Sequence, residues 1–340
     1  MVRITEEVWP QHSLSRSRGT VEAPASPAEI PSEGYECSPS LTPCVLLRRI
    51  QITSPAGETI HFHLNGSLVL TQIMRLIEIK GFGELSLTKN FTEDIPRYAI
   101  LSHTWGGDDD EVTFADFIAG AGLSKAGYRK IEFCRKQAVK DGLRYFWVDT
   151  CCIDKSNPAE LSEAINSMFH WYRDAVKCYV YLIDVSTRGP GAGESIPKSV
   201  WGLEFRQSRW FTRAWTLQEL IAPTTVEFFS REGQRLGDKR SEEASLEQIT
   251  GIPVEVFRGK SIAEYTVNQW MVWATERRAK RKEDEAYCLL GIFNVHMSLK
   301  YGEGRAKAFA RLQSKIQKHS QNRFSGKNCN NSKLGTHSRT

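Results

Sequence analysis

Three short segments of the chain gather carboxylates, aromatic rings and small polar side chains at spacings that suit a ligand site. The first runs from Ser102 to Gly106, at the end of an apolar stretch. Ser102 and His103 offer a polar rim, Trp105 an aromatic platform, and Gly106 a point where a ligand can approach the backbone. The alternative, which these residues alone favour, is a strand end packed by Trp105 with His103 simply hydrogen-bonded.

The second segment, residues 147–155, reads WVDTCCIDK. Asp149 leaves a buried strand, a frequent position for site residues in α/β folds, and Cys152 and Asp154 follow in the same candidate pocket loop. Cys151 could act as a nucleophile. No histidine lies near it in sequence to serve as its base, so a catalytic cysteine is disfavoured. The alternative for Asp149 and Asp154 is that their carboxylates accept hydrogen bonds that shape the loop.

The third segment, residues 213–220, reads RAWTLQEL. Trp215 and Glu219 are four positions apart, so on a helix they share one face. A carboxylate beside an indole, shielded from water, is suited to stabilising a cationic, sugar-derived transition state. The alternative is a core tryptophan and a glutamate paired with Arg213, which the segment alone favours.

The elements that must position these segments alternate along the chain. Apolar runs predict strands at residues 98–105, 145–150, 178–185 and 225–229. Periodicity and an Asn157 cap predict helices at residues 127–141, from 157 onward and at 211–221. This alternation predicts an α/β fold on a mainly parallel, doubly wound sheet. Because ligands bind such sheets at the carboxyl ends of the strands, the loops after Ser102 and Asp149 are the candidate site.

Composition divides the chain into four parts. Residues 1–73 are rich in Ser, Pro and Glu and predict a largely disordered extension, whereas 74–250 form the predicted α/β core. Residues 251–318 turn helical, and 319–340 lack an apolar period and predict a disordered tail. Within the extension, His61 and His63 alternate as on one face of a strand. Without a third ligand nearby, a surface strand is favoured over a metal site, and no metal is expected.

Cysteine usage and the N-terminus indicate a reducing compartment. Several of the eight cysteines lie in apolar runs, and no pair has the spacing of a zinc knuckle. They are therefore predicted to be buried free thiols. The N-terminus lacks the apolar region of a signal peptide, and no stretch is long and apolar enough for a membrane span. A soluble cytoplasmic protein with no membrane partner is expected.

The net charge of +5 gives little support to nucleic-acid binding, because the basic residues are scattered among acids. One basic cluster, residues 277–282, could act as a nuclear signal. Three acidic residues follow it at once, at positions 283–285. A solvated junction between helices is therefore the favoured interpretation.

Taken together, the three segments closely resemble the signature blocks of the fungal HET (heterokaryon incompatibility) domain. The matching motifs are YAILSHTWG, the block from WVDTCCIDK to KCYVYL, and RWFTRAWTLQELIAP, with MRLIEIKG, EVTFADF, EDEAYCLLGIF, YGEG and AFARLQ in the same order. The resemblance runs from about residue 74 to 316. It implies that residues 1–73 are an extension or a gene-model artefact. No GxxxxGK[ST] phosphate loop occurs in the chain, which implies a HET domain without its own sensor module.

The HET domain is in turn similar to the TIR fold, a flavodoxin-like parallel sheet. The stretch Ser208-Arg209-Trp210 followed by Trp215-x-x-x-Glu219-Leu220 resembles one in TIR domains, whose NAD-cleaving members use that glutamate as a catalytic residue. By this resemblance Glu219 is the catalytic candidate, with Trp215 supporting its helix, and NAD is a candidate substrate; no cofactor is implied. Fold likeness by itself is a weak warrant for chemistry.

Three functions remain as alternatives. The first is an effector of vegetative incompatibility that triggers programmed cell death after non-self recognition, through protein partners or self-assembly into homo-oligomers. The second is a TIR-like NAD glycohydrolase that uses Glu219. The third, a basic regulator that binds nucleic acid, rests only on the cluster at residues 277–282 and predicts salt-sensitive binding. The first two differ in whether Glu219→Gln abolishes activity while the fold is kept.

Overall fold

The computed structural model describes residues 49–53, 59–63, 74–189 and 197–328. The chain forms two compact units, Met1–Thr71 and Gln72–Thr340. In the first unit, β1 (Arg49–Thr53) pairs antiparallel with β2 (Thr59–His63). His61 and His63 therefore lie on a strand, as predicted. The rest of the predicted extension, and residues 329–340 of the predicted tail, lie outside the described residues.

A mixed sheet forms the centre of the second unit; within the described residues it has seven strands, in the order β4-β3-β6-β5-β7-β8-β9. The inner four are parallel: β6 (Tyr145–Trp147), β5 (Tyr98–His103), β7 (Lys177–Leu182) and β8 (Val226–Ser230). Antiparallel strands complete both edges: β3 (Ile77–Ile79), β4 (Leu85–Leu87) and β9 (Arg235–Asp238).

The predicted α/β class and all four predicted strands are confirmed, and these four strands are the parallel part of a mixed sheet. Every residue of β5 and β8 is buried, as expected for strands covered on both faces. The three antiparallel strands were not predicted. Each has only three or four residues, too few to establish an alternating pattern.

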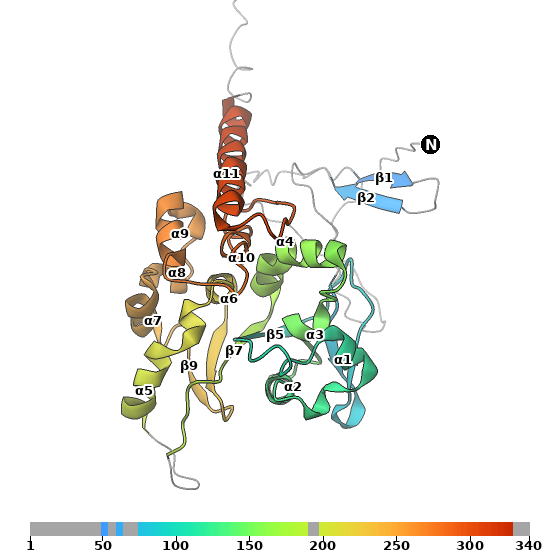
Figure 1. The fold of residues 1–340 in the computed structure, drawn as a ribbon, viewed down its shortest axis with the longest axis vertical. Coiled ribbons are helices and arrows are strands. Elements are labelled where there is room, and N and C mark those ends of the chain that lie inside the picture. The colour runs from blue at the N-terminus through green and yellow to red at the C-terminus, as the bar shows by residue number, and fades with distance from the viewer. Residues whose placement is uncertain (1–48, 54–58, 64–73, 190–196, 329–340) are drawn as a thin grey trace, which may run out of the picture. The chain divides into compact units, whose positions relative to one another are not determined.

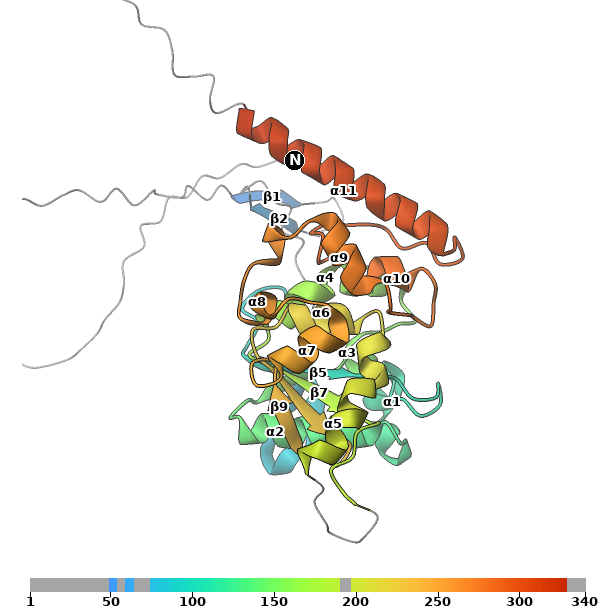
Figure 2. The same ribbon diagram turned by 90° about the vertical axis from the view of Figure 1, so that its left-hand side faces the viewer.

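The described helices surround the sheet (Figures 1 and 2). They are α1 (Phe114–Ala119), α2 (Tyr128–Lys140), α3 (Asp149–Cys152), α4 (Pro158–Asp174), α5 (Lys198–Gln207), α6 (Thr216–Ile221), α7 (Glu243–Thr250), α8 (Val254–Phe257), α9 (Val267–Ala274), α10 (Asp284–Tyr287) and α11 (Arg305–Asn328). Figure 1 shows α1, α2 and α3 grouped beside β5, and α5 and α7 beside β9. In both views α9, α10 and α11 lie at the end of this unit where α4 and α6 lie. Among the described residues, no helix combines the length and apolar character that a membrane span requires.

Helix α4 forms where the sequence predicts it. The Asn157 side chain accepts hydrogen bonds from the backbone N–H groups of Ala159 and Glu160 at 3.1 and 3.3 Å, and Pro158 occupies the first helical position. Glu160, three residues after the cap, does not bond back to the cap. Its side chain accepts a hydrogen bond from the backbone of Asp154 at 2.7 Å and pairs with Arg75.

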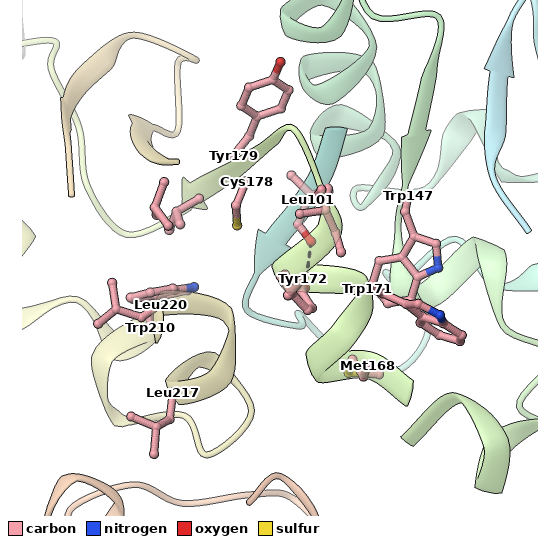
Figure 3. Close-up of a cluster of buried hydrophobic side chains, with 14 of the residues drawn as sticks. Leu101, Trp147, Met168, Trp171, Tyr172, Cys178, Tyr179, Trp210, Leu217 and Leu220 are labelled. Atoms are coloured by element: carbon pink, nitrogen blue, oxygen red, sulfur yellow. Dashed lines mark hydrogen bonds between the residues drawn. The ribbon is translucent and has the colours of Figure 1, made fainter. Parts of the chain in front are cut away.

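The core under the site contains large aromatic side chains from β6 and α4 (Figure 3). Trp147 contacts Trp171 with ring centroids 5.6 Å apart, and Tyr172 meets Trp147 edge-on. The Tyr172 hydroxyl donates a hydrogen bond to the carbonyl of Leu101 at 3.0 Å. This bond ties α4 to β5, the strand that carries Ser102 and His103.

Two helical predictions need correction. The predicted helix at 211–221 is a 3₁₀ turn, Arg209–Thr212, followed by α6, because Arg213 is extended and bridges to Arg278. A long-range backbone contact thus overrides the local helical pattern. At the other end, α11 continues to Asn328, so the helix extends ten residues beyond its predicted end at residue 318.

Candidate functional site

A cavity of about 220 Å³ opens at the carboxyl ends of β5 and β6. The chain passes from β5 to β6 on one side of it and then to β7 on its other side, so the strand order reverses at β5. Ligands of parallel sheets bind at such a reversal, at the carboxyl ends of the strands. The walls come from the loops after β5 and β6, from α4, from α6, and from the segment between residues 280 and 301. The lining residues are His103, Trp105, Asp149, Ile153, Lys155, Leu161, Ile165, Met168, Tyr172, Arg213, Trp215, Thr216, Glu219, Lys280, Arg281, Asp284 and Tyr301.

Glu219 lies at the base of the cavity on α6 and is 7% exposed. Its Oε2 accepts a hydrogen bond from Ser102 Oγ at 2.5 Å, and Ser102 Oγ accepts one from Trp210 Nε1 at 2.8 Å. Ser102 is itself fully buried, one layer beneath the cavity. The three side chains therefore form a fixed chain of donors and acceptors that ends on the carboxylate.

Burial raises the pKa of Glu219 to about 8, although the hydrogen bond from Ser102 acts in the opposite direction. The negative charge of Asp149 raises it further, while Arg213 lowers it. The folded state of the domain thus favours the protonated form of Glu219 near neutral pH. A cationic ligand placed beside it would favour its ionised form.

Trp105, Asp149 and Lys155 form a cluster at the rim. Asp149 Oδ2 accepts hydrogen bonds from Trp105 Nε1 at 3.0 Å and from Lys155 Nζ at 3.2 Å. Lys155 Nζ also lies 3.8 Å from the centroid of the Trp105 ring, within cation–π range. Burial by itself would raise the pKa of Asp149, but the charge of Lys155 and its hydrogen bond outweigh burial and leave that pKa below its ordinary value. Asp149 is therefore ionised and fixes the indole at the rim.

His103 lines the same cavity as a neutral imidazole. Its Nε2 lies 3.6 Å from Asp149 Oδ1 and has no hydrogen-bond partner within the described part of the chain. Burial, followed by the charge of Lys130, lowers the pKa of His103 to about 3 despite Asp149. His103 Nε2 is thus a buried polar atom, without a partner among the described residues, on a side chain that lines the cavity.

The C-terminal wall supplies residues that the sequence did not single out. The Tyr301 hydroxyl donates a hydrogen bond to Asp284 Oδ1 at 2.9 Å. Burial raises the pKa of Asp284, against hydrogen bonds from Tyr301 and Trp215. The guanidinium of Arg281 lies 4.2 Å from the centroid of the Tyr301 ring.

Most of the predicted site residues come together. His103, Trp105, Asp149, Trp215 and Glu219 line one cavity, with Ser102 directly behind Glu219. The cavity also uses Tyr172, Arg213, Asp284 and Tyr301, which the sequence analysis did not propose. The signal for Asp284 and Tyr301 was present in the motifs EDEAYCLLGIF and YGEG. Their separation from Glu219 in sequence hid their shared location.

Besides Ser102, three predicted residues lie outside this cavity. Gly106 lines a neighbouring hollow, where its N–H donates to Glu111 Oε1 at 2.7 Å. Asp154 lines another hollow and accepts hydrogen bonds from the backbone and hydroxyl of Ser156 at 3.0 and 2.6 Å, which is the predicted alternative role of shaping the loop. The Cys152 thiol points into the core and accepts from the backbone of Val148 at 3.4 Å.

The adjacent cysteines lack the properties of nucleophiles. Cys151 and Cys152 are buried, and burial raises the pKa of the Cys151 thiol to about 12 and that of Cys152 well above its ordinary value. The five cysteines of the described residues are all buried free thiols, as predicted. In this part of the chain no group of His, Cys, Asp and Glu side chains is arranged to hold a metal ion.

The sheet and the cavity define an α/β domain with a carboxylate site at the ends of its parallel strands. A family model described as "Heterokaryon incompatibility protein (HET)" matches residues 98–199, which include His103, Trp105 and Asp149. The chain belongs to this HET family. It is 55% identical over 246 residues to "Vegetative incompatibility protein HET-E-1" of Podospora anserina, an alignment that covers 72% of this chain and 18% of the relative. The chain thus spans less than a fifth of that relative's length. No solved structure matches it.

Proposed function

We propose that this chain is an effector of heterokaryon incompatibility that acts in the cytoplasm and triggers programmed cell death after non-self recognition. The observation that carries the proposal is the 55% identity to a vegetative incompatibility protein over 72% of the chain. We further propose that a protein partner or self-assembly activates the chain, because the chain matches only 18% of its relative and non-self recognition would then rest with another protein.

Inducible expression of the full chain in a filamentous fungus tests this proposal. The chain is fused to a domain that dimerises when a small molecule is added, so that assembly can be triggered without changing the amount of protein expressed. We expect loss of viability on expression or on dimerisation. A matched strain expressing the dimerisation domain alone should grow normally. Normal growth of cells that accumulate the folded, dimerised chain would overturn the proposal.

A second candidate activity is hydrolysis of NAD to ADP-ribose and nicotinamide, with NAD as substrate rather than cofactor. Two observations favour it: Glu219 lies at the base of an aromatic-rimmed cavity, and the parallel strands have the order β6-β5-β7-β8, which is the flavodoxin-like order that TIR domains share. Glu219 would stabilise the oxocarbenium-like ribose as the bond between C1′ and the pyridinium nitrogen breaks. Nicotinamide leaves with the bonding electrons, and water adds to C1′ and loses a proton.

Release of nicotinamide from NAD by the purified chain tests this activity, with Glu219→Gln as the variant and the exposed Glu255→Gln as its matched control. We expect turnover by the parent and by Glu255→Gln, and a loss of about 100-fold or more in Glu219→Gln with an unchanged circular dichroism spectrum. Absence of turnover by the parent, even when it is concentrated or crowded to force assembly, would leave the effector acting as a scaffold alone.

A further inference from the structure

The charges around the cavity do not balance. Four cationic side chains line it: Lys155, Arg213, Lys280 and Arg281. Two of them are neutralised by acids, since Lys155 pairs with Asp149 at 3.2 Å and Lys280 pairs with Asp108. The other two are guanidinium groups without a carboxylate partner in the described part of the chain.

Arg213 is the more enclosed of the two. Its backbone is fixed on both sides, because its N–H donates to the carbonyl of Trp210 at 3.3 Å and its carbonyl accepts from Arg277 Nη1 at 3.1 Å. Its half-buried side chain has no hydrogen bond or ion pair to the described residues. Its charge nevertheless reaches the base of the cavity, where it lowers the pKa values of Glu219 and His103.

Arg281 lines the same cavity, and its guanidinium lies over the face of Tyr301. The charge of Arg281 acts to lower the pKa of the neighbouring carboxyl groups of Asp284 and Glu283. Arg213 instead acts on Glu219, whose pKa burial raises to about 8, and a protonated carboxyl group cannot balance a fixed positive charge. The cavity therefore carries an unbalanced positive charge at Arg213, and the aromatic rings of Trp105 and Trp215 line the same cavity.

We propose that Arg213 and Arg281 bind a phosphate group of the ligand, and that the ligand is a nucleotide whose planar ring lies against the aromatic side chains of the same cavity. A guanidinium presents its N–H donors in a planar fork that matches two oxygens of a phosphate. This inference rests on the cavity being the ligand site of the proposed function.

The test is direct binding to the full chain, measured by isothermal titration calorimetry at constant chloride. The probes are two matched pairs: adenosine monophosphate against adenosine, and nicotinamide mononucleotide against nicotinamide riboside. We expect at least one phosphorylated probe to bind about 10-fold more tightly than its unphosphorylated partner, as one charge-assisted contact allows. Arg213→Gln and the exposed Arg281→Gln should each abolish this preference. Arg206→Gln removes the same charge from the exposed face of α5 and should retain it.

Equal affinity within both pairs, no binding of either phosphorylated probe, or a preference that survives in Arg281→Gln would each overturn the inference. Arg281 is exposed, so its variant gives a clear answer even if Arg213→Gln fails to fold. Glu219→Gln separates this inference from the proposed activity, since it should keep the preference for phosphate. Phosphate binding without cell death or NAD cleavage would retain the ligand class and reject the function.

Discussion

At the scale of single residues, Glu219 and His103 make opposite contributions to the pH dependence of stability. The pKa of Glu219 is raised to about 8, so the folded state keeps a proton that the unfolded chain loses above its ordinary pKa of 4.5. Its contribution to stability is fully present below pH 4.5 and is lost as the pH rises through 8. The pKa of His103 is lowered to about 3. Its contribution is present above pH 6.5 and is lost as the pH falls toward 3.

Glu219→Gln should therefore stabilise the domain relative to the parent as the pH rises from 6.5 to 8, where His103 is neutral in both states. Each pKa unit corresponds to about 1.4 kcal/mol, so the relative gain between these pH values is at most about 2 kcal/mol. Urea denaturation of parent and variant at several pH values measures the free energy of unfolding. In Glu255→Gln, which removes a similar but exposed carboxylate, the profile should follow the parent. Parallel profiles for the parent and Glu219→Gln would show that Glu219 is ionised in the folded state.

The sequence predicted those candidate residues that stand in short, recognisable segments of the chain. Glu219, Trp215, Asp149 and His103 stand in short segments with recognisable spacing, and all four line the cavity. The hydrogen bond from Ser102 to Glu219 joins residues 117 positions apart. Such a contact depends on how strand and helix pack, and no local pattern encodes it.

At the scale of elements, Asn157 and Pro158 encode the start of α4. Replacing Asn157 by Ala removes the acceptor for the N–H groups of Ala159 and Glu160. We expect a loss of about 1 kcal/mol in the free energy of unfolding, measured as a lower midpoint in urea. Asn157→Asp keeps an acceptor at the cap and should retain most of the stability. A loss of equal size in both variants would mean that the cap bond contributes little.

The boundary of α6 shows why other elements could not be predicted. Residues 211–221 have a helical apolar pattern, yet the helix begins only at Thr216. The N–H of Ala214 donates to the carbonyl of Arg278 at 2.9 Å, and the N–H of Arg278 donates to the carbonyl of Thr212 at 2.7 Å. These two bonds hold residue 213 extended, so tertiary contact determines the boundary. The same bridge places Arg213 on the cavity wall. The helix boundary that the sequence did not predict therefore also positions a residue of the site.

At the scale of the whole molecule, the site combines parts of the chain that are distant in sequence. The sequence predicts an α/β core up to residue 250 and a helical part of the same HET region after it. The cavity draws on both parts, since β5, β6, α4 and α6 line it together with residues from 280 to 301. Arg277, which is 3% exposed, links these parts by donating to Thr216 Oγ1 at 2.8 Å. The helical region is thus a structural part of the site.

The division between the two compact units makes a prediction about truncation. Residues 72–340 expressed alone should unfold at the same temperature as the full chain, because they form a compact unit with its own hydrophobic core. A shorter form, residues 82–340, should not fold. It lacks β3 and the buried side chains of Met74, Leu76 and Ile77, and with Met74 it loses the backbone bridge to Phe91.

The free energies of burial explain why residues 82–340 should not fold. Burying one large aliphatic side chain contributes about 1.5–3 kcal/mol, so removing three costs roughly 5–9 kcal/mol. The net stability of a domain is only about 5–15 kcal/mol. Thermal unfolding followed by circular dichroism compares the three forms. If residues 72–340 melted well below the full chain, the first unit would contribute to the stability of the second. If residues 82–340 gave a cooperative transition near that of the full chain, strand β3 would be dispensable, and the parallel strands would fold without it.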